Sequence, residues 1–322
     1  MRTALISGIT GQDGAYLAQF LLDKGYKVIG LTRKFVSKIP SLDYLGIGDS
    51  VVKEECDLTD ITSVMKVFQS YNPSEVYNLA AQSSVGLSFK QPIGTLQYNI
   101  NSVLNLLESI RIYNPAIRLY QASSSEMYGK VSSLPITMDT PMHPVSPYAI
   151  SKAAAHWTVI NYREAYNLFV CNGVLFNHES YLRSPSFFVK KVVVEAVKMS
   201  QNPELKLVLG NLKVKRDFGY SPKYVEAMWL MLQQSTPEDF FICSGKSILL
   251  EDVVKHIFNR LNVDFSRVLI DKSLFRPTEI MDIYGDNQEA KSKLHWDYAY
   301  TFFDILDILV SEEIKNQNSI DK

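Results

Sequence analysis

Apolar runs of strand length alternate with helical periodicities over the first 176 residues of the 322-residue chain. The run Ala4–Ile6 leads into three glycines and then into apolar positions 16–21 with the spacing of one helix face, which predicts a buried strand, a tight turn and a helix. Further strands are predicted from runs at 26–31, 51–56, 75–80, 117–122 and 168–176, and long helices from periodic positions at 95–112 and 148–166. The alternation predicts an α/β fold, a Rossmann-type doubly wound parallel sheet.

Beyond residue 176 the alternation becomes irregular. Shorter elements are predicted at 187–199, around 207, and at 224–234, 240–243 and 268–270. We therefore expect a smaller, mixed α/β C-terminal lobe over the crevice of the sheet. In this division the sheet domain spans 1–176 with a return segment at about 218–243, and the second lobe spans 177–217 and 244–322.

Charge and composition exclude several classes of function. The 33 basic residues nearly balance the 34 acidic ones and are dispersed, so no nucleic-acid partner is expected. The chain shows no signal peptide and no run of about 18 apolar residues, which favours a cytoplasmic protein that does not enter a membrane. Cys56, Cys171 and Cys243 lie in or beside apolar runs without metal-like spacing, so we expect buried thiols and no metal site.

The glycine turn after the first strand is the first candidate site. Gly8, Gly11 and Gly14 lack the Cβ atoms that would keep a pyrophosphate away from backbone N–H groups and from the N-terminus of the next helix. They indicate a bound dinucleotide, although a tight turn without a ligand uses the same glycines. Arg33 and Lys34 stand where an acidic residue would hold the ribose of NAD, which favours NADP over NAD; a solvated basic loop is the alternative.

Small or polar residues lie at the carboxyl ends of the third, fourth and fifth predicted strands. Asp57 follows the third strand, where it could accept from an adenine amino group or cap a helix. The fourth strand runs into Ala81–Ser84, where small residues would let a ligand lie against the backbone. The fifth strand ends in Ser124, Ser125 and Glu126. Because hydroxyls and a carboxylate are costly to bury without partners, we expect a functional site there.

Tyr148 and Lys152 are four residues apart and share one helix face. A lysine ammonium near a phenol lowers the pKa of the phenol towards the working pH of a proton-transfer catalyst. The same spacing is common on solvated helices. Combined with the glycine turn and with Ser124, it predicts a catalytic site.

These motifs together resemble the extended short-chain dehydrogenase/reductases, and among them the GDP-mannose 4,6-dehydratase family, over almost the whole chain. The resemblance is carried by Gly8–Gly14, Asn78–Ser83, Ala122–Gly129, Tyr148 with Lys152, Leu175–Ser180, Leu209–Leu212, Arg216 with Asp217, Tyr224–Trp229 and Arg276–Glu279. It implies an NADP-dependent hydro-lyase that converts a GDP-hexose, GDP-mannose or GDP-N-acetylglucosamine, to its 4-keto-6-deoxy derivative and water. Such an enzyme recycles its cofactor and serves deoxysugar synthesis for surface glycans.

The resemblance also implies roles for single residues. Tyr148, supported by Lys152, would take the C4 hydroxyl proton, Ser124 would bond the C4 oxygen, and Glu126 would remove the C5 proton and help to expel the C6 hydroxyl. The cofactor would contact Gly8, Thr10, Gly11, Gln12, Asp13, Gly14, Arg33, Lys34, Asp57, Leu58, Leu79, Ala80, Ala81, Ser83, Tyr148, Lys152, His178 and Arg183. The GDP-sugar would contact Ser84, Ser125, Glu126, Asn177, Lys191, Arg216, Arg276 and Glu279.

Several positions depart from the family pattern, so GDP is better supported than mannose; they are Lys34–Phe35, Ser84, Ser184–Ser186, Tyr220 and Lys223. The alternative enzyme is a nucleotide-sugar 4-epimerase or 4-keto-sugar reductase, which needs Tyr148 and Lys152 but no carboxylate at position 126. A non-catalytic NADP-binding regulator is the third hypothesis. The resemblance further implies a homodimer or homotetramer through the helices at 95–112 and 148–166, although their apolar faces would also suit an ordinary core.

Overall fold

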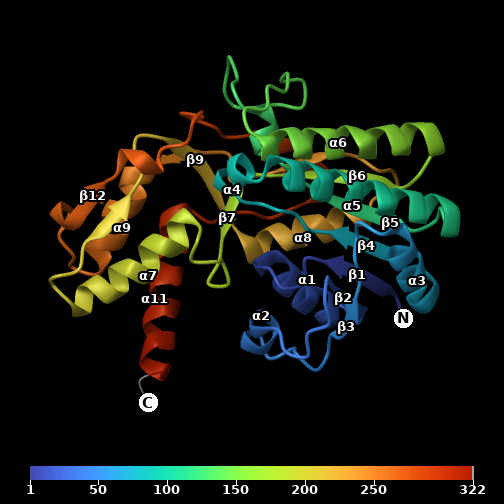
Figure 1. Cartoon of the computed structure of the whole chain (residues 1–322), viewed down its shortest axis with the longest axis horizontal. Coiled ribbons are helices and arrows are strands. Elements are labelled where there is room, and N and C mark those ends of the chain that lie inside the picture. Colours follow the sequence, from blue (N-terminus) through green and yellow to red (C-terminus); the bar gives the residue numbers. More distant parts are fainter. Residues whose placement is uncertain (321–322) are drawn as a thin grey trace.

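The predicted strands assemble into a seven-stranded parallel sheet in the computed structural model, which describes residues 1–320 (Figure 1). In the order β10–β6–β5–β4–β1–β2–β3, the strands are Phe240–Ile242, Val170–Leu175, Arg118–Ser124, Glu75–Asn78, Thr3–Ser7, Lys27–Thr32 and Val52–Glu55. Neighbouring strands all run parallel, so their carboxyl ends lie along one edge of the sheet. The prediction of a doubly wound α/β fold is confirmed.

Helices cover both faces of this sheet, because successive residues of each strand point to opposite sides. On one face, Ile6 and Tyr77 pack in a cluster with α1 (Gln12–Asp23) and α8 (Ser221–Leu232). On the other face, Leu5 and Val76 pack in a cluster that draws on α3 (Ile61–Tyr71), α5 (Pro92–Tyr113) and α6 (Pro147–Tyr166). Both faces are thus buried, as in other parallel sheets.

A second, smaller lobe lies beside the carboxyl edge of the sheet (Figure 1). It contains a three-stranded sheet, β11–β9–β7 (Ser247–Leu249, Lys215–Tyr220, Asn177–Glu179), and a two-stranded sheet, β12–β8 (Val268–Ile270, Leu207–Leu209). Its helices α7 (Phe188–Gln201), α9 (Leu250–Arg260) and α11 (Phe302–Ile320) share one apolar core, whereas α10 (Gln288–Leu294) packs against α8 and β10 of the sheet domain. Two further helices, α2 (Pro40–Tyr44) and α4 (Val85–Lys90), belong to the sheet domain.

The sequence analysis missed several of these helices and was right about the cysteines. It places no helix in residues 34–48, which contain α2, in residues 85–90, which form α4, or in the segment after residue 270, which contains the 19-residue α11. Cys56, Cys171 and Cys243 are free and buried, as predicted. Within residues 1–320, each helix is too short or too polar to span a bilayer.

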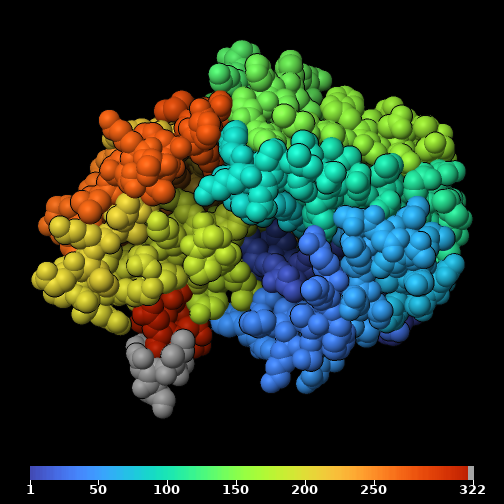
Figure 2. Space-filling model, in the orientation of Figure 1, coloured from blue at the N-terminus to red at the C-terminus, as the bar shows by residue number. Residues whose placement is uncertain are grey.

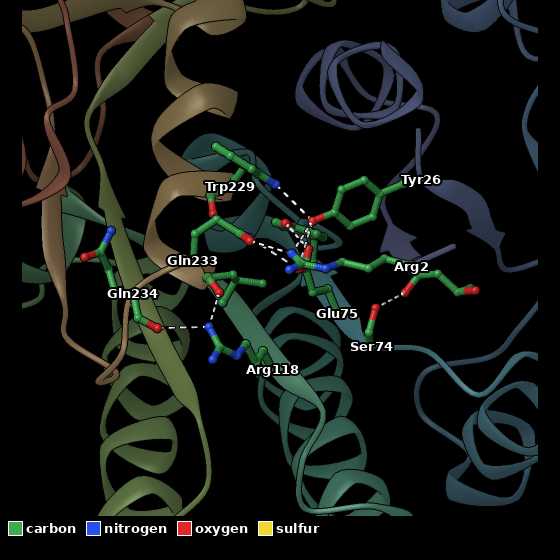
Figure 3. Close-up of polar contacts among 11 residues, drawn as sticks. Arg2, Tyr26, Ser74, Glu75, Arg118, Trp229, Gln233 and Gln234 are labelled. Atoms are coloured by element: carbon green, nitrogen blue, oxygen red, sulfur yellow. Dashed lines mark hydrogen bonds and ion pairs between the residues drawn. The ribbon is translucent and has the colours of Figure 1, made fainter. Parts of the chain in front are cut away.

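A buried carboxylate joins several elements at the amino end of the sheet, opposite the glycine turn (Figure 3). Glu75 of β4 is 2% exposed, and its oxygens accept hydrogen bonds from Tyr26 Oη at 3.0 Å and Tyr77 Oη at 2.7 Å. Gln233, just after α8, donates to it at 3.2 Å, and the Arg2 guanidinium lies 3.4 Å away. These contacts connect the amino ends of β1, β2 and β4 with the end of α8. They also compensate the Glu75 carboxylate, which would be costly to bury without partners.

Candidate functional site

A cavity of about 530 Å³ lies between the carboxyl edge of the main sheet and the smaller lobe, where the surface is hollowed in Figure 2. The predicted site residues that line it are Gly8, Gly11, Gln12, Asp13, Gly14, Leu79, Ala81, Ser83, Ser84, Ser124, Glu126, Tyr148, Lys152, Asn177, His178, Arg183, Lys191 and Arg276. Arg33 and Asp57 line a separate cavity of about 520 Å³ together with Tyr98 of α5. The remaining predicted residues line neither cavity; they are Thr10, Lys34, Leu58, Ala80, Ser125, Arg216 and Glu279.

The glycine turn joins β1 to α1 by a close backbone approach. Gly8 has a φ of +72°, and a Cβ there would lie 2.9 Å from the backbone nitrogen of Ala80; a Cβ at Gly14 would lie 2.4 Å from the carbonyl oxygen of Gly8. Ser7 Oγ accepts from the backbone N–H groups of Leu79 and Ala80 at 3.1 and 3.2 Å, which fixes the end of β4 beside the turn. Gly11 is exposed and lines the cavity, so the turn and the N-terminus of α1 fit a pyrophosphate.

Tyr148 and Lys152 lie in the first two turns of α6, which starts with Pro147 after the N-cap Ser146. The Ser146 hydroxyl accepts a hydrogen bond from the Ala149 N–H at 3.1 Å. Lys152 Nζ donates to the carbonyl oxygen of Ala122 in β5 at 2.8 Å, and both side chains are almost fully buried. The helix start therefore places the phenol and the ammonium beside the end of β5, where Ser124 lies.

Burial is the main cause of the pKa shifts of Lys152 and Tyr148. It lowers the pKa of Lys152 to about 8. It also raises the pKa of Tyr148 to about 12, an effect that the Ser124 hydroxyl and the Arg183 charge oppose and the Glu126 charge reinforces. The expected lowering of the Tyr148 pKa by Lys152 is not found, because the ammonium is directed to Ala122 O. A further positive charge in the cavity would favour the phenolate.

Glu126 supplies the only titratable carboxylate among Ser123–Tyr128, at the start of the 3₁₀ turn that follows β5. Ser124 Oγ accepts from the Glu126 N–H at 3.3 Å and so fixes the backbone of this turn. Arg276 Nη1 lies 3.6 Å from Glu126 Oε1, and Arg276 Nε lies 3.8 Å from Glu279 Oε1. A carboxylate held by a guanidinium, in the same cavity as Tyr148, is suited to accept a proton.

The residues predicted to bind the substrate come from both lobes. Asn177 begins β7 and lines the cavity, and Lys191 of α7 lines it too, with its Nζ donating to Val208 O at 2.8 Å. Ser84 is the N-cap of α4, where its Oγ accepts from the Leu87 N–H at 3.2 Å. Arg216 is buried behind the cavity and donates to the carbonyl oxygens of Lys215 and Ile280 at 2.7 and 2.6 Å. In the structure Arg216 is thus directed to backbone carbonyls.

Sequence reasoning missed several residues that line the cavity, most of them apolar and drawn equally from the two lobes. They are Val85, Gly86, Ala122, Ser123, Leu175, Phe176, Ser186, Phe187, Phe188, Leu209, Gly210 and Leu274. The aromatic pair Phe187–Phe188 at the start of α7 is the one signal that could have indicated a stacking surface, since the other apolar positions read as ordinary core. Within residues 1–320, we find no cluster of His, Cys, Asp or Glu side chains arranged to hold a metal ion.

Comparison with known proteins places this chain among sugar-nucleotide enzymes. The family model described as GDP-mannose 4,6 dehydratase matches residues 5–309. GDP-mannose 4,6 dehydratase 1 of Arabidopsis thaliana is 41% identical over 98% of this chain and 90% of its own length. The GDP-mannose 4,6-dehydratase of Vibrio cholerae is 36% identical over 98% of this chain and 94% of its own length.

Solved structures share the fold at lower sequence identity. dTDP-glucose 4,6-dehydratase of Bacillus anthracis, in complex with NAD, superposes with a TM-score of 0.86 at 21% identity, covering 99% of this chain and 98% of the other. UDP-glucose 4-epimerase of Thermotoga maritima, with UDP-glucose, gives 0.88 at 22% identity, with coverages of 98% and 99%. RMD of Pseudomonas aeruginosa, complexed with NADPH, gives 0.83 at 21% identity, with coverages of 98% and 100%.

Proposed function

Since the chain belongs to the GDP-mannose 4,6-dehydratase family, we propose that it removes water from GDP-mannose to give the 4-keto-6-deoxy sugar nucleotide. The observation that carries this proposal is the Glu126 carboxylate in one cavity with Tyr148 and Lys152. A 4-epimerase or a 4-keto-sugar reductase needs a tyrosine and a lysine for proton transfer at C4, but neither reaction requires a base for C5. The carboxylate therefore favours the dehydratase.

Each residue has one task in the proposed reaction. The Tyr148 phenolate, formed once a positive charge in the cavity lowers its pKa, takes the C4 hydroxyl proton, and Ser124 bonds the C4 oxygen. Oxidation of C4 to a ketone makes the C5 proton acidic. Glu126 takes that proton and gives it to the C6 hydroxyl, which leaves as water; after hydride has been added to C6, Glu126 delivers to C5 a proton drawn from solvent. NADP, when bound at the glycine turn, supplies the hydride acceptor for C4 and the hydride donor for C6.

Mass spectrometry of the product tests the proposed reaction. The purified protein is incubated with GDP-mannose, GDP-N-acetylglucosamine, dTDP-glucose or UDP-glucose in deuterated water, with NADP supplied. We expect GDP-mannose alone to lose the mass of one water and to carry deuterium at C5, because Glu126 exchanges its proton with solvent. Water loss from a different sugar nucleotide would correct the substrate, and water loss from none would reject the dehydratase in favour of the reductase.

We propose NADP rather than NAD because Arg33 lines the cavity that also contains Asp57. The Arg33 guanidinium is exposed and stacks on the Tyr98 ring at 4.7 Å, where it can form a bidentate pair with a 2′-phosphate. Arg33→Ala is expected to weaken NADP binding by about tenfold or more and to leave NAD binding within about twofold. Calorimetry with each cofactor measures both values.

Lys34→Ala is the matched control for Arg33, since Lys34 is the adjacent exposed cation but lines neither cavity. It is expected to weaken NADP binding less than Arg33→Ala. Equal effects of the two substitutions on both cofactors would support the solvated basic loop instead.

We propose a homodimer through α5 and α6, which run side by side along one flank of the molecule (Figure 1). Their outer surface exposes Ile93 and Leu104 of α5 and Ile150 and Trp157 of α6, with Ile93 70% and Trp157 59% exposed. Trp157→Glu is expected to convert a dimer into monomers, because a buried charge opposes association. Sedimentation measures the change, and Leu269→Glu, an exposed apolar position on β12, is the control that should leave the dimer intact. A monomeric wild type would remove this proposal.

A further inference from the structure

Two adjacent side chains in the first turn of α1 are bonded to the smaller lobe's β7 and to α8. Asp13 Oδ2 lies 2.8 Å from His178 Nε2, and Asp13 Oδ1 accepts from Ser221 Oγ at 2.7 Å. Gln12 donates to the backbone oxygen of His178 at 2.9 Å and accepts from Ser180 Oγ at 2.7 Å. Each oxygen of the Asp13 carboxylate thus already has a protein donor, although the resemblance assigns this residue to the cofactor.

The hydrogen bonds fix the protonation of His178. Its Nδ1 lies 2.7 Å from the backbone oxygen of Phe176, which can only accept, so Nδ1 carries a proton. Its Nε2 faces the Asp13 carboxylate, which also only accepts when ionised, so Nε2 carries a second proton. Burial acts to raise the pKa of Asp13, but the charge and hydrogen bonds of His178 and the bond from Ser221 outweigh it and keep the pKa below its ordinary value.

The other groups around the pair are compatible with a charged ring. The Tyr224 ring lies 4.8 Å from the His178 ring, centroid to centroid, and stays neutral because burial raises the pKa of its phenol well above the ordinary value. Glu179 follows His178 in β7 and lies 3.6 Å from Arg183, so the two offset each other's charge. Asp13 is therefore the counter-ion that contacts His178 directly.

We propose that Asp13 and His178 form an ion pair that positions Asn177 for the sugar nucleotide, so that the side chain of Asp13 acts on the substrate and its carboxylate is not a ligand of the cofactor. His178 is the residue after Asn177 in β7, and its ring and its backbone oxygen are both held by the start of α1. The strand cannot shift towards or away from the cavity without breaking these bonds. This inference rests on the proposed function, because Asn177 is one of the residues assigned to binding of the GDP-sugar.

Nitrogen-15 NMR of the histidine side chains tests the ion pair in the wild-type protein. The chain has five histidines, and His178→Gln identifies the signals of His178 by their loss. We expect both ring nitrogens of His178 to carry protons at neutral pH, and one of them to lose its proton in Asp13→Asn. A wild-type His178 with a single proton overturns the proposal, and this outcome does not depend on the folding of any variant other than the one used for assignment.

Binding of GDP and NADP separates the two roles of Asp13. Asp13→Asn is expected to weaken GDP-mannose or GDP binding by about tenfold and to change NADP binding by no more than about twofold. Ser221→Ala is the matched control: it removes the other donor to the same carboxylate, keeps the ion pair, and should leave GDP binding within about twofold. If Asp13→Asn weakens NADP binding as much as or more than GDP binding, Asp13 is a cofactor ligand or a general structural residue, and the proposal is wrong. If the wild type binds no GDP, the proposed function fails, whereas the NMR result still decides the ion pair.

Discussion

Glu126→Gln is expected to abolish the release of water and to leave oxidation at C4 in place. Glutamine has the shape of glutamate and can still bond Arg276, but its amide cannot accept the C5 proton, and the loss of a general base lowers the rate by about 10²- to 10⁴-fold. Tyr148, Lys152 and Ser124 remain, so the 4-keto sugar nucleotide that still carries its C6 hydroxyl should accumulate. Mass spectrometry of the reaction mixture measures it. Undiminished water release from the variant would contradict the role given to Glu126.

Glu279→Gln is the comparison for this experiment. Glu279 lies 3.8 Å from the same arginine, so its replacement also removes a carboxylate partner of Arg276 but leaves the base in the cavity. We expect a higher KM for the sugar nucleotide and continued water release from every molecule oxidised at C4. An accumulation of the 4-keto intermediate in both variants would mean that Arg276, and not the Glu126 base, controls the elimination.

Lys152→Met is expected to remove activity and to stabilise the fold. Activity should fall by at least about 10²-fold, because the cavity loses one of its positive charges, and the Tyr148 phenolate forms only when positive charge in the cavity lowers the pKa of the phenol. Burial lowers the pKa of Lys152 to about 8 from 10.5, so the charged form destabilises the folded state at neutral pH, and its removal should raise the free energy of unfolding by about 3 kcal/mol. Between about pH 8 and 10.5 the unfolded chain binds more protons than the folded one, so the wild type gains stability as the pH rises, and the gap to Lys152→Met closes. Denaturant unfolding at several pH values measures the gap; a variant less stable than the wild type at pH 7 would contradict the argument.

Lys190→Met is the matched control, with the opposite expected sign. Lys190 of α7 is as buried as Lys152, but its Nζ lies 2.7 Å from Glu313 Oε2 of α11. Its removal leaves the Glu313 carboxylate buried without a counter-ion, which costs about 3 kcal/mol. The same substitution at two buried lysines should thus stabilise one variant and destabilise the other. Unfolding curves that shift in the same direction would mean that lost packing, not charge, decides both results.

The parts of the fold that could be predicted from the sequence are those with local signals. The glycine turn and the strands that alternate with helices gave the doubly wound sheet, and the return of residues 240–242 to that sheet is consistent with the expected return segment. α2 has five residues, too few for a helical period to emerge. The pattern of α11 was present in Phe302, Ile305, Leu306, Leu309 and Val310, which are buried at helical spacing, and it was overlooked.

The parts of the site that could not be predicted depend on contacts between distant segments. Asp13 meets His178 and Ser221 across 165 and 208 positions, and Arg33, which follows β2, meets Tyr98 of α5. Likewise, a helical spacing of Tyr148 and Lys152 is visible in the sequence, but the direction of the ammonium towards Ala122 O is not, because it depends on how α6 packs on β5. Residue type and spacing indicated the candidate chemistry, whereas the partners of each polar group required the folded chain.

The buried Glu75 cluster sets an order in which this protein can mature during synthesis. Glu75, Tyr26 and Tyr77 are made early, but Gln233, which donates to Glu75, is translated more than 150 positions later. Until α8 has docked, the nascent sheet holds a carboxylate with an incomplete set of donors, and the face that α8 covers stays open to solvent. A nascent chain stalled before α8 would therefore be a substrate for chaperones and proteases, and its first strands would become stable only when the second half of the chain has emerged.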